Sequence, residues 1–229
     1  MTLLIGERYR PKLAQSLAGQ GIDVFWLPDN PALDPRLAGH GDLSVFVCKK
    51  RAIVAESLYS PDIVNLLTNR GYETVRSGRQ GPAYPKDAGL CVCRTGRYTI
   101  YDPKTADPAV LDIADGVLVA VAQGYTKCAA LIVDDHSIVT ADPGVSRVAK
   151  TAGMDVLDIA PGHIALEGYE YGFIGGASFI IDDDTVAFTG TLDEHPDRDR
   201  ILVFLAERGK RPVFLTADPI FDIGGAISV

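Results

Sequence analysis

The stretch Gly124–Asp135, GYTKCAALIVDD, reappears 48 residues later as Gly172–Asp183, GFIGGASFIIDD. A shorter copy at 222–229, DIGGAISV, lines up with 173–180 at an offset of 49 residues. A period of this length is typical of one supersecondary unit that is stacked in a row or arranged around an axis. Each copy joins a glycine-rich corner, where backbones can approach closely, to an apolar strand. The repeat therefore predicts internal symmetry, with the glycine corners gathered at the centre.

The same order of elements can be followed five times: an apolar strand, a polar turn, a second strand, a helix and a returning strand. The apolar strands are expected at 3–5, 45–48, 90–93, 131–133 and 179–181, and the returning strands at 23–28, 73–78, 117–124, 155–162 and 212–219. Helix starts are expected at Ser60-Pro61, Asp107-Pro108, Asp142-Pro143 and His195-Pro196, and helix ends near glycines. The last apolar stretch, 226–229, is expected to meet the N-terminal strand and to close the fifth unit. The sequence thus predicts one domain over residues 1–229, a five-fold pseudosymmetric α/β propeller of ββαβ units.

Alternating strands and helices also suit a doubly wound α/β sheet. A dinucleotide-binding version of that fold needs a G-x-G-x-x-G segment between its first strand and helix. The chain has IGERYRPK at this place, over 5–12, which argues against this alternative.

Composition excludes several classes of function. The formal net charge of −8, without any Lys/Arg-rich run, disfavours a nucleic-acid partner. The N-terminal apolar run is too short for a signal peptide, and no run reaches the roughly 18 apolar residues of a membrane span. The four cysteines have no zinc-like spacing. We therefore expect a reduced, cytoplasmic protein without metal or organic cofactor.

Polar residues at the corners between units are the candidates for a central site, because those corners face the pseudo-axis. They are Asp87, Gln123, Cys128, His163, Glu167 and Asp222. The consecutive aspartates at 134–135 and 182–184 lack the spacing of a Ca²⁺ loop and are interpreted as solvated turns.

Four corner motifs follow one another in a recognisable order: YPKDAG at 84–89, QGY at 123–125, GHI at 162–164 and GGAISV at 224–229. This order resembles the pentein superfamily of guanidino-group-modifying enzymes, most closely sequences of the agmatine deiminase type and their arginine deiminase relatives. The resemblance covers almost the whole chain as a repeat pattern. It implies a five-fold propeller and a reaction at a guanidino carbon.

The resemblance also implies roles for single residues. Asp87 matches the aspartate that pairs with the substrate guanidinium, and His163 matches the general acid/base. Three positions depart from the pattern: Gln123 replaces a glutamate, Ala165 replaces an aspartate, and Val229 stands in the place of the nucleophilic cysteine. These departures place the chain in a divergent branch.

Cys128 offers a replacement for the missing nucleophile. It is expected to start the strand after the Gln123 corner, close to the pseudo-axis, where His163 would lower its pKa. The alternative is a small buried residue, because free cysteine is among the most buried residue types.

Two functions follow from these alternatives. The first is a hydrolase or transferase acting on a guanidino or amidino C–N bond of a cationic small molecule, with Cys128 as nucleophile, His163 as acid/base, and Asp87, Gln123, Glu167 and Asp222 binding the substrate. The second is a catalytically inactive pentein that acts by binding, as a ribosome anti-association factor of the superfamily does.

Overall fold

A computed structural model of the protein describes all 229 residues and contains five three-stranded sheets. The inner strands are β3 (Val45–Cys48), β6 (Cys93–Arg94), β9 (Ala130–Ile132), β12 (Ser178–Asp182) and β15 (Ile227–Ser228). The middle strands are β1 (Thr2–Gly6), β4 (Arg51–Val54), β7 (Tyr98–Tyr101), β10 (Ser137–Thr140) and β13 (Thr185–Phe188). The outer strands are β2 (Asp23–Leu27), β5 (Glu73–Arg76), β8 (Val117–Ala120), β11 (Asp155–Asp158) and β14 (Arg211–Phe214).

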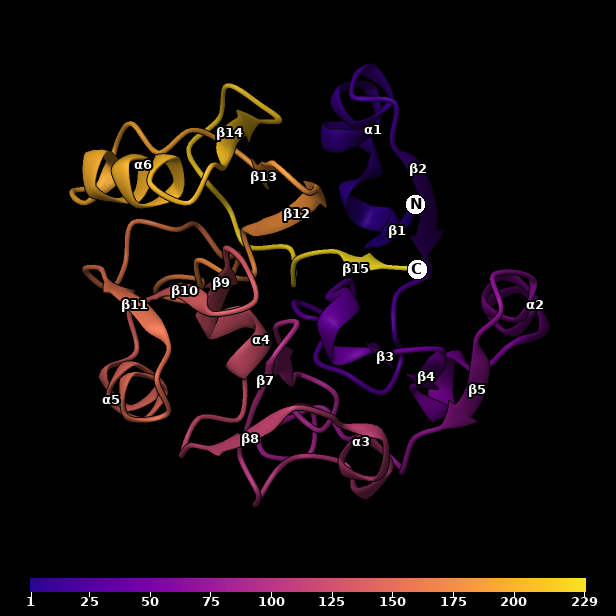
Figure 1. Ribbon diagram of the computed structural model, residues 1–229. Coiled ribbons are helices and arrows are strands. Elements are labelled where there is room, and N and C mark those ends of the chain that lie inside the picture. Colours follow the sequence, from indigo (N-terminus) through magenta and orange to yellow (C-terminus); the bar gives the residue numbers. More distant parts are fainter.

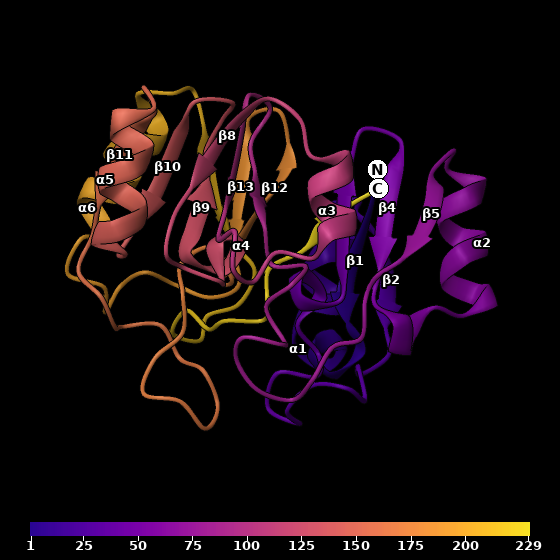
Figure 2. The same cartoon turned by 90° about the horizontal axis from the view of Figure 1, so that it is seen from below.

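Each sheet repeats one topology around a common axis (Figure 1). The inner strand is antiparallel to the middle strand, and the outer strand is parallel to it. A helix links each middle strand to its outer strand: α1 (Arg10–Gly19), α2 (Pro61–Asn69), α3 (Pro108–Ile113), α5 (Pro143–Thr151) and α6 (Arg198–Ala206). These helices lie at the periphery (Figure 1), and the side view shows α2 at one end of the molecule and α5 and α6 at the other (Figure 2). The predicted five-fold propeller of ββαβ units is therefore confirmed.

The fifth unit combines the two ends of the chain. Strand β15 pairs with β1, with Leu3 opposite Ser228, and the backbones of Thr2 and Val229 exchange two hydrogen bonds of 2.9 and 3.1 Å. The N and C labels accordingly lie side by side in Figure 1. The N-terminal strand β1 is thus the middle strand of this unit, between β15 and β2.

Three of the four expected helix starts are confirmed, because α2, α3 and α5 begin at Pro61, Pro108 and Pro143. The Asp107 carboxylate accepts the backbone N–H of Ala109, and the Asp142 carboxylate accepts those of Gly144 and Val145. Each bond satisfies a backbone donor that has no partner within the helix. Helix α6 instead begins at Arg198, two residues after the expected proline.

Two segments next to the axis differ from the prediction. The stretch 90–93 is a strand only from Cys93, because the backbone N–H of Cys91 turns back to the carbonyl of Ala88. Cys128 does not start a strand. It lies in a one-turn helix, α4 (Thr126–Ala129), directly before β9.

Apolar side chains fill the space between neighbouring units and between each sheet and its helix. A further, smaller cluster lies at the axis and consists of Leu33, Leu37, Leu43, Cys91 and Cys128. Two thiols thus belong to the central packing. None of the helices has the length and apolar content needed to cross a bilayer.

Candidate functional site

The corner that precedes each inner strand brings one residue to the axis at an equivalent place. The equivalent place is three residues before the inner strand begins. Asp42 stands there before β3 and Lys127 before β9. Glycines stand there before two further strands, Gly175 before β12 and Gly224 before β15. Gly224 leaves room for the Asp42 side chain, because a β-carbon on it would lie 2.6 Å from Asp42 Oδ1. A β-carbon on the next residue, Gly225, would lie 3.2 Å from Lys127 Nζ. The pseudosymmetric centre therefore holds one acidic and one basic side chain.

Asp42 is the hydrogen-bond acceptor for two thiols. Cys128 donates to its Oδ2 at 2.7 Å, and Cys91 donates to the same oxygen at 3.3 Å. All three side chains are buried, with exposed fractions of 3% or less. The second oxygen, Asp42 Oδ1, has no hydrogen-bond partner.

His40 completes this cluster from the same corner as Asp42. Its imidazole is buried, and its Nδ1 lies 3.9 Å from Oδ1 of Asp222. Its Nε2 has no hydrogen-bond partner. One ligand atom from each of His40, Asp42 and Cys128 lies within 4.8 Å of the others.

Burial makes the acidic groups of the cluster harder to ionise than exposed ones. Burial raises the pKa of Asp42, an effect that the nearby His40 and Lys127 charges oppose. The contact with Cys91, followed by burial, raises the pKa of the Cys128 thiol well above its ordinary value. At neutral pH Cys128 is therefore a thiol that donates to Asp42, and it needs a proton acceptor to become a nucleophile.

Cys128 and His40 face a cavity of about 320 Å³. Aromatic rings make up much of its wall: Tyr125, Tyr169, Tyr171 and Phe173. Asp222 and Glu170 add two carboxylates. Four of its lining residues, Leu166, Tyr169, Glu170 and Asp222, also line a wider outer cavity of about 820 Å³.

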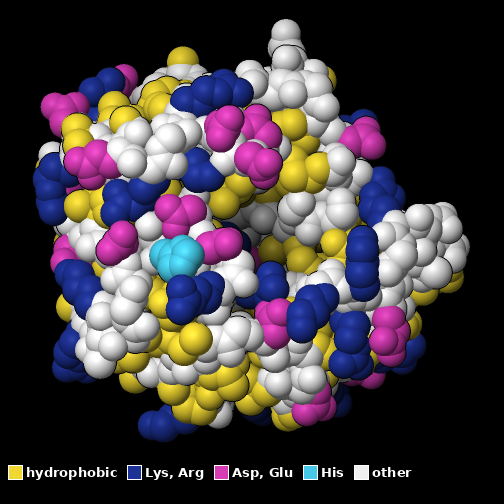
Figure 3. All heavy atoms as spheres, viewed as in Figure 1, with side chains coloured by type: hydrophobic (Ala, Val, Ile, Leu, Met, Phe, Trp, Pro, Cys, Tyr) yellow, Lys and Arg dark blue, Asp and Glu magenta, His cyan; other side chains and the backbone are white.

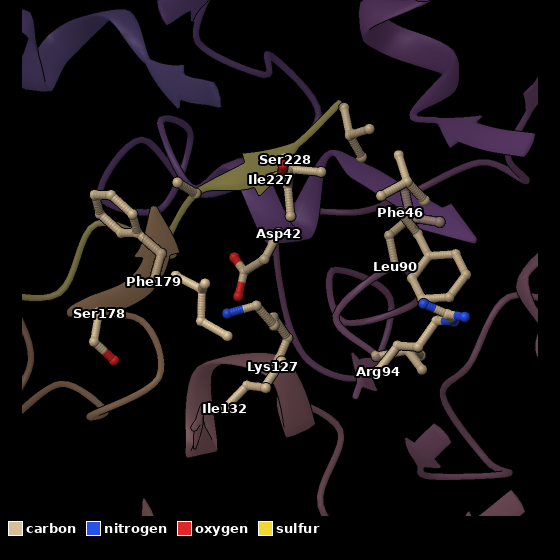
Figure 4. A pocket seen from close by; sticks show the side chains of 15 residues that line it. Asp42, Phe46, Leu90, Arg94, Lys127, Ile132, Ser178, Phe179, Ile227 and Ser228 are labelled. Carbon is tan, nitrogen blue, oxygen red and sulfur yellow. The ribbon is translucent and has the colours of Figure 1, made fainter. Parts of the chain in front are cut away.

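A second cavity, of about 260 Å³, lies beside Asp42 and is lined mainly by apolar residues. Figure 3 shows a hollow near the middle of the face that is seen in Figure 1. In the close-up of Figure 4, the Lys127 ammonium and the Asp42 carboxylate point toward each other in the cavity. Asp42 lines this cavity while its donor Cys128 lines the aromatic one. The cluster therefore separates two cavities.

The structure brings some of the predicted site residues to the aromatic cavity. Cys128 and Asp222 line it. Asp87 lies behind the wall and is buried, and its Oδ2 accepts a hydrogen bond of 2.7 Å from the hydroxyl of Tyr125, which lines the cavity. Both Asp222 oxygens accept backbone N–H groups, from Phe173 and Gly224, so this carboxylate also ties two corners together.

The other predicted residues lie elsewhere. His163 is exposed at a positive φ of 62°, and its ring packs against that of His195, with 5.6 Å between centroids. The structure does not bring His163 to Cys128, whose polar partners are Asp42 and Cys91. Gln123 donates to Asp142 and accepts from the backbone of Tyr125. Glu167 is exposed and lines the outer cavity.

His40 and Asp42 are the site residues that sequence reasoning missed. Both stand in the segment Gly39–Ser44, GHGDLS, which comes directly before the expected strand at 45–48. Every other unit has its corner at this place. Applying the repeat to the second unit would have named them.

Comparison with known proteins now gives the relationship. A family model described as "Family of unknown function (DUF6873)" matches residues 4–227. The chain belongs to this family. No curated protein sequence matches it.

Solved structures extend the comparison to the fold. DDAH from Pseudomonas aeruginosa, in complex with citrulline, is similar with a TM-score of 0.53 and 13% identity, over 97% of this chain and 92% of that one. The inosamine-phosphate amidinotransferase of Streptomyces griseus gives a TM-score of 0.57 at 12% identity, over 93% of this chain and 75% of the other. The amidinotransferase SxtG of Microseira wollei gives 0.55 at 11% identity, over 93% and 87%. The chain therefore shares the fold of these structures.

Proposed function

We propose that this DUF6873 chain is a hydrolase or transferase that acts on a guanidino or amidino C–N bond of a small cationic molecule. The observation that carries the proposal is the Cys128 thiol, which faces an aromatic cavity and is hydrogen-bonded to a buried carboxylate with an imidazole beside it. The fold supports it, because similar structures include DDAH bound to citrulline and two amidinotransferases.

The walls of the cavity suit a flat cation. A guanidinium is attracted to the faces of aromatic rings, and Tyr125, Tyr169 and Tyr171 supply such rings. The Arg36 guanidinium already lies 4.6 Å from the centroid of the Tyr169 ring, at the border with the outer cavity. Asp222 and Glu170 provide the balancing negative charge.

The proton acceptor in this proposal is Asp42, supported by His40. When the Cys128 sulfur attacks the guanidino carbon, its proton passes along the existing hydrogen bond to Asp42 Oδ2. Return of a proton from this cluster to the departing amine breaks the C–N bond and leaves the amidino group on sulfur. Water or an acceptor amine then attacks that carbon and restores the thiol. His163 has no part here, because it is exposed and packs on His195.

A matched pair of reagents tests the proposal. Chloroacetamidine is a cation and chloroacetamide is its neutral analogue, so their relative rates measure cation recognition next to a thiol. For each reagent, the alkylation rate of Cys128 is divided by the rate of the same reagent with a free thiol. We expect this ratio to be at least about tenfold higher for chloroacetamidine than for chloroacetamide. We also expect agmatine or arginine to slow the alkylation of Cys128 by chloroacetamidine. The site of modification is read by peptide mass spectrometry. Two variants form a matched pair, Cys128→Ala and Cys93→Ala, because Cys93 is also buried but lies outside the cluster. Only Cys128→Ala should lose the cation-directed labelling.

The alternative is a pentein that binds a ligand without turning it over. The observation that favours it is the burial of Cys128, which is 3% exposed and whose thiol donates its proton to Asp42. It predicts that guanidino compounds bind without release of amine or ammonia. Equal rates for the two reagents, together with no product from agmatine or arginine, would exclude the enzyme.

A further inference from the structure

We propose that His40, Asp42 and Cys128 form a binding site for Zn²⁺ at the centre of the propeller. The three side chains are 2%, 1% and 3% exposed, and one ligand atom of each lies within 4.8 Å of the other two. The proposal does not depend on catalysis by Cys128. Where Cys128 is a nucleophile, bound zinc occupies its sulfur and blocks it.

Two buried polar atoms in the cluster lack partners. These are His40 Nε2 and Asp42 Oδ1, and neither has a hydrogen-bond donor or acceptor within reach. Leaving a buried polar atom unsatisfied costs about 1–3 kcal/mol, so such atoms are rare in folded proteins. A cation that accepts a lone pair from each would satisfy both.

The spacing of the ligand atoms suits a tetrahedral ion after a small adjustment. Zinc binds sulfur at about 2.3 Å and nitrogen or oxygen at about 2.0–2.2 Å, which separates neighbouring ligand atoms by about 3.3–3.8 Å. The Sγ of Cys128 lies 2.7 Å from Asp42 Oδ2 because a proton joins them. Zinc held by both oxygens of the Asp42 carboxylate replaces that proton when Sγ and Oδ2 separate by about 1 Å, and it also gives Oδ1 a partner.

The groups around the ligands support this arrangement. Metal-bound imidazoles usually have a carboxylate near their other nitrogen. The Asp222 carboxylate lies 3.9 Å from His40 Nδ1, which leaves Nε2 as the ligand atom. Asp222 is itself held by backbone N–H groups of Phe173 and Gly224, so it is a fixed partner.

Charge and ligand type favour zinc over harder ions. A thiolate and a carboxylate with a neutral imidazole balance the two positive charges of Zn²⁺, so a neutral centre replaces a buried acid. Thiolate and imidazole select zinc against Mg²⁺ and Ca²⁺, which prefer oxygen ligands. Cys128 and His40 line the aromatic cavity, so a water from that cavity can complete the shell.

Metal binding is measured directly on the full chain. The protein is stripped of metal with a chelator, incubated with Zn²⁺ and dialysed. We then expect elemental analysis to find one Zn²⁺ per chain. Zinc binding should release at least one proton, because the thiol ionises. Co²⁺ as the probe should give the visible absorption of a tetrahedral ion and a thiolate-to-metal charge-transfer band. A folded chain that binds no zinc, or a Co²⁺ spectrum without the thiolate band, overturns the proposal.

Variants assign the ligands. We expect Cys128→Ser, Asp42→Asn and His40→Ala each to weaken zinc binding at least about 100-fold, a loss at the upper end of that seen for outer-shell partners. Cys93→Ala should bind zinc like the unmodified chain, because this buried cysteine belongs to a different apolar cluster from Cys128. Unchanged binding in Cys128→Ser, or equal weakening in Cys93→Ala, contradicts the site. Where a variant does not fold, the Co²⁺ spectrum of the unmodified chain decides.

Labelling separates this inference from the proposed function. In metal-free protein, faster alkylation of Cys128 by chloroacetamidine than by chloroacetamide supports the enzyme whatever zinc does. Stoichiometric zinc should then prevent that alkylation. If the protein binds zinc but chloroacetamidine shows no preference for Cys128, the metal site is supported and the enzyme is not. If zinc leaves the labelling of Cys128 unchanged, the metal site is contradicted.

Discussion

His195 is a buried imidazole whose environment disfavours its charged form. It is 3% exposed, its Nδ1 accepts the backbone N–H of Asp197 at 3.0 Å, and its Nε2 has no partner. Burial lowers its pKa from the ordinary value of 6.5, aided by His163 and opposed by Asp197. The unfolded chain therefore takes up this proton more readily than the folded one. Stability from this residue is complete above pH 6.5 and is lost as pH falls toward the lower pKa of the folded state.

We expect His195→Asn to reduce this loss of stability below pH 6.5, because the asparagine oxygen can accept the same N–H without taking up a proton. Each unit of pKa depression corresponds to about 1.4 kcal/mol of stability lost at low pH. Urea unfolding at several pH values measures how the free energy of unfolding depends on pH in each variant. His136→Asn, at an exposed histidine, should leave the pH dependence as it is. If the free energy of unfolding falls with pH as steeply in His195→Asn as in the unmodified chain, groups other than His195 cause the loss of stability.

At the same scale, the sequence predicted only part of the central cluster. Cys128 and Asp222 were found because they stand in the visible repeats. His40 and Asp42 were missed because their corner, GHGDLS at 39–44, does not match the sequence of the visible copies, although it occupies the same place before its strand. The ligand set also has no zinc-like spacing, since Cys128 comes from a different unit. Side chains that meet at an axis leave no short motif.

Among the elements, the corners before the inner strands are closely packed. Gly176 lies where three corners meet: its N–H donates to the carbonyl of Cys128 at 3.0 Å, and a β-carbon on it would lie 2.0 Å from Asp222 Oδ1. We expect Gly176→Ala to destabilise the fold by about 1–3 kcal/mol, since a packed corner cannot take an extra methyl. Gly19→Ala, at the end of α1 with nothing within 4 Å, should be neutral or stabilising.

Denaturant unfolding of the two glycine variants measures the difference. A similar free energy of unfolding for both would show that the corners give way easily. The expected contrast would show instead that Asp222 and the Cys128 corner are held rigidly, as a preformed site requires.

The order and type of elements could be predicted because each unit repeats the same local signals. Aspartate before proline fixed the starts of α3 and α5, and apolar runs fixed most inner strands. The signals failed closest to the axis, at 90–93 and at Cys128, where backbone turns replace ladder pairing. Tertiary contacts between units, rather than local propensity, set the backbone there.

For the whole molecule, the closed ring of units is the property that the fold depends on. The chain keeps a pentein architecture at 11–13% identity to the solved structures described above. Packing of five similar units around an axis constrains the pattern of apolar and glycine positions and leaves most other positions free. The repeat was therefore enough to predict the architecture, while the site had to be found in three dimensions.

A ring in which β15 pairs with β1 should not depend on where the chain is opened. We expect a circular permutant, with Val229 joined to Met1 by a short Gly/Ser linker and new ends between Lys49 and Lys50, to fold with the same secondary structure. The new ends lie in the exposed turn between β3 and β4, whereas the old ends already exchange backbone hydrogen bonds through Thr2 and Val229. Deletion of 226–229 should instead destabilise the protein strongly, because it removes the inner strand of one sheet. Circular dichroism and urea unfolding compare the two. A permutant as unstable as the deletion would mean that the ring requires its natural connection, not only the β1–β15 pairing.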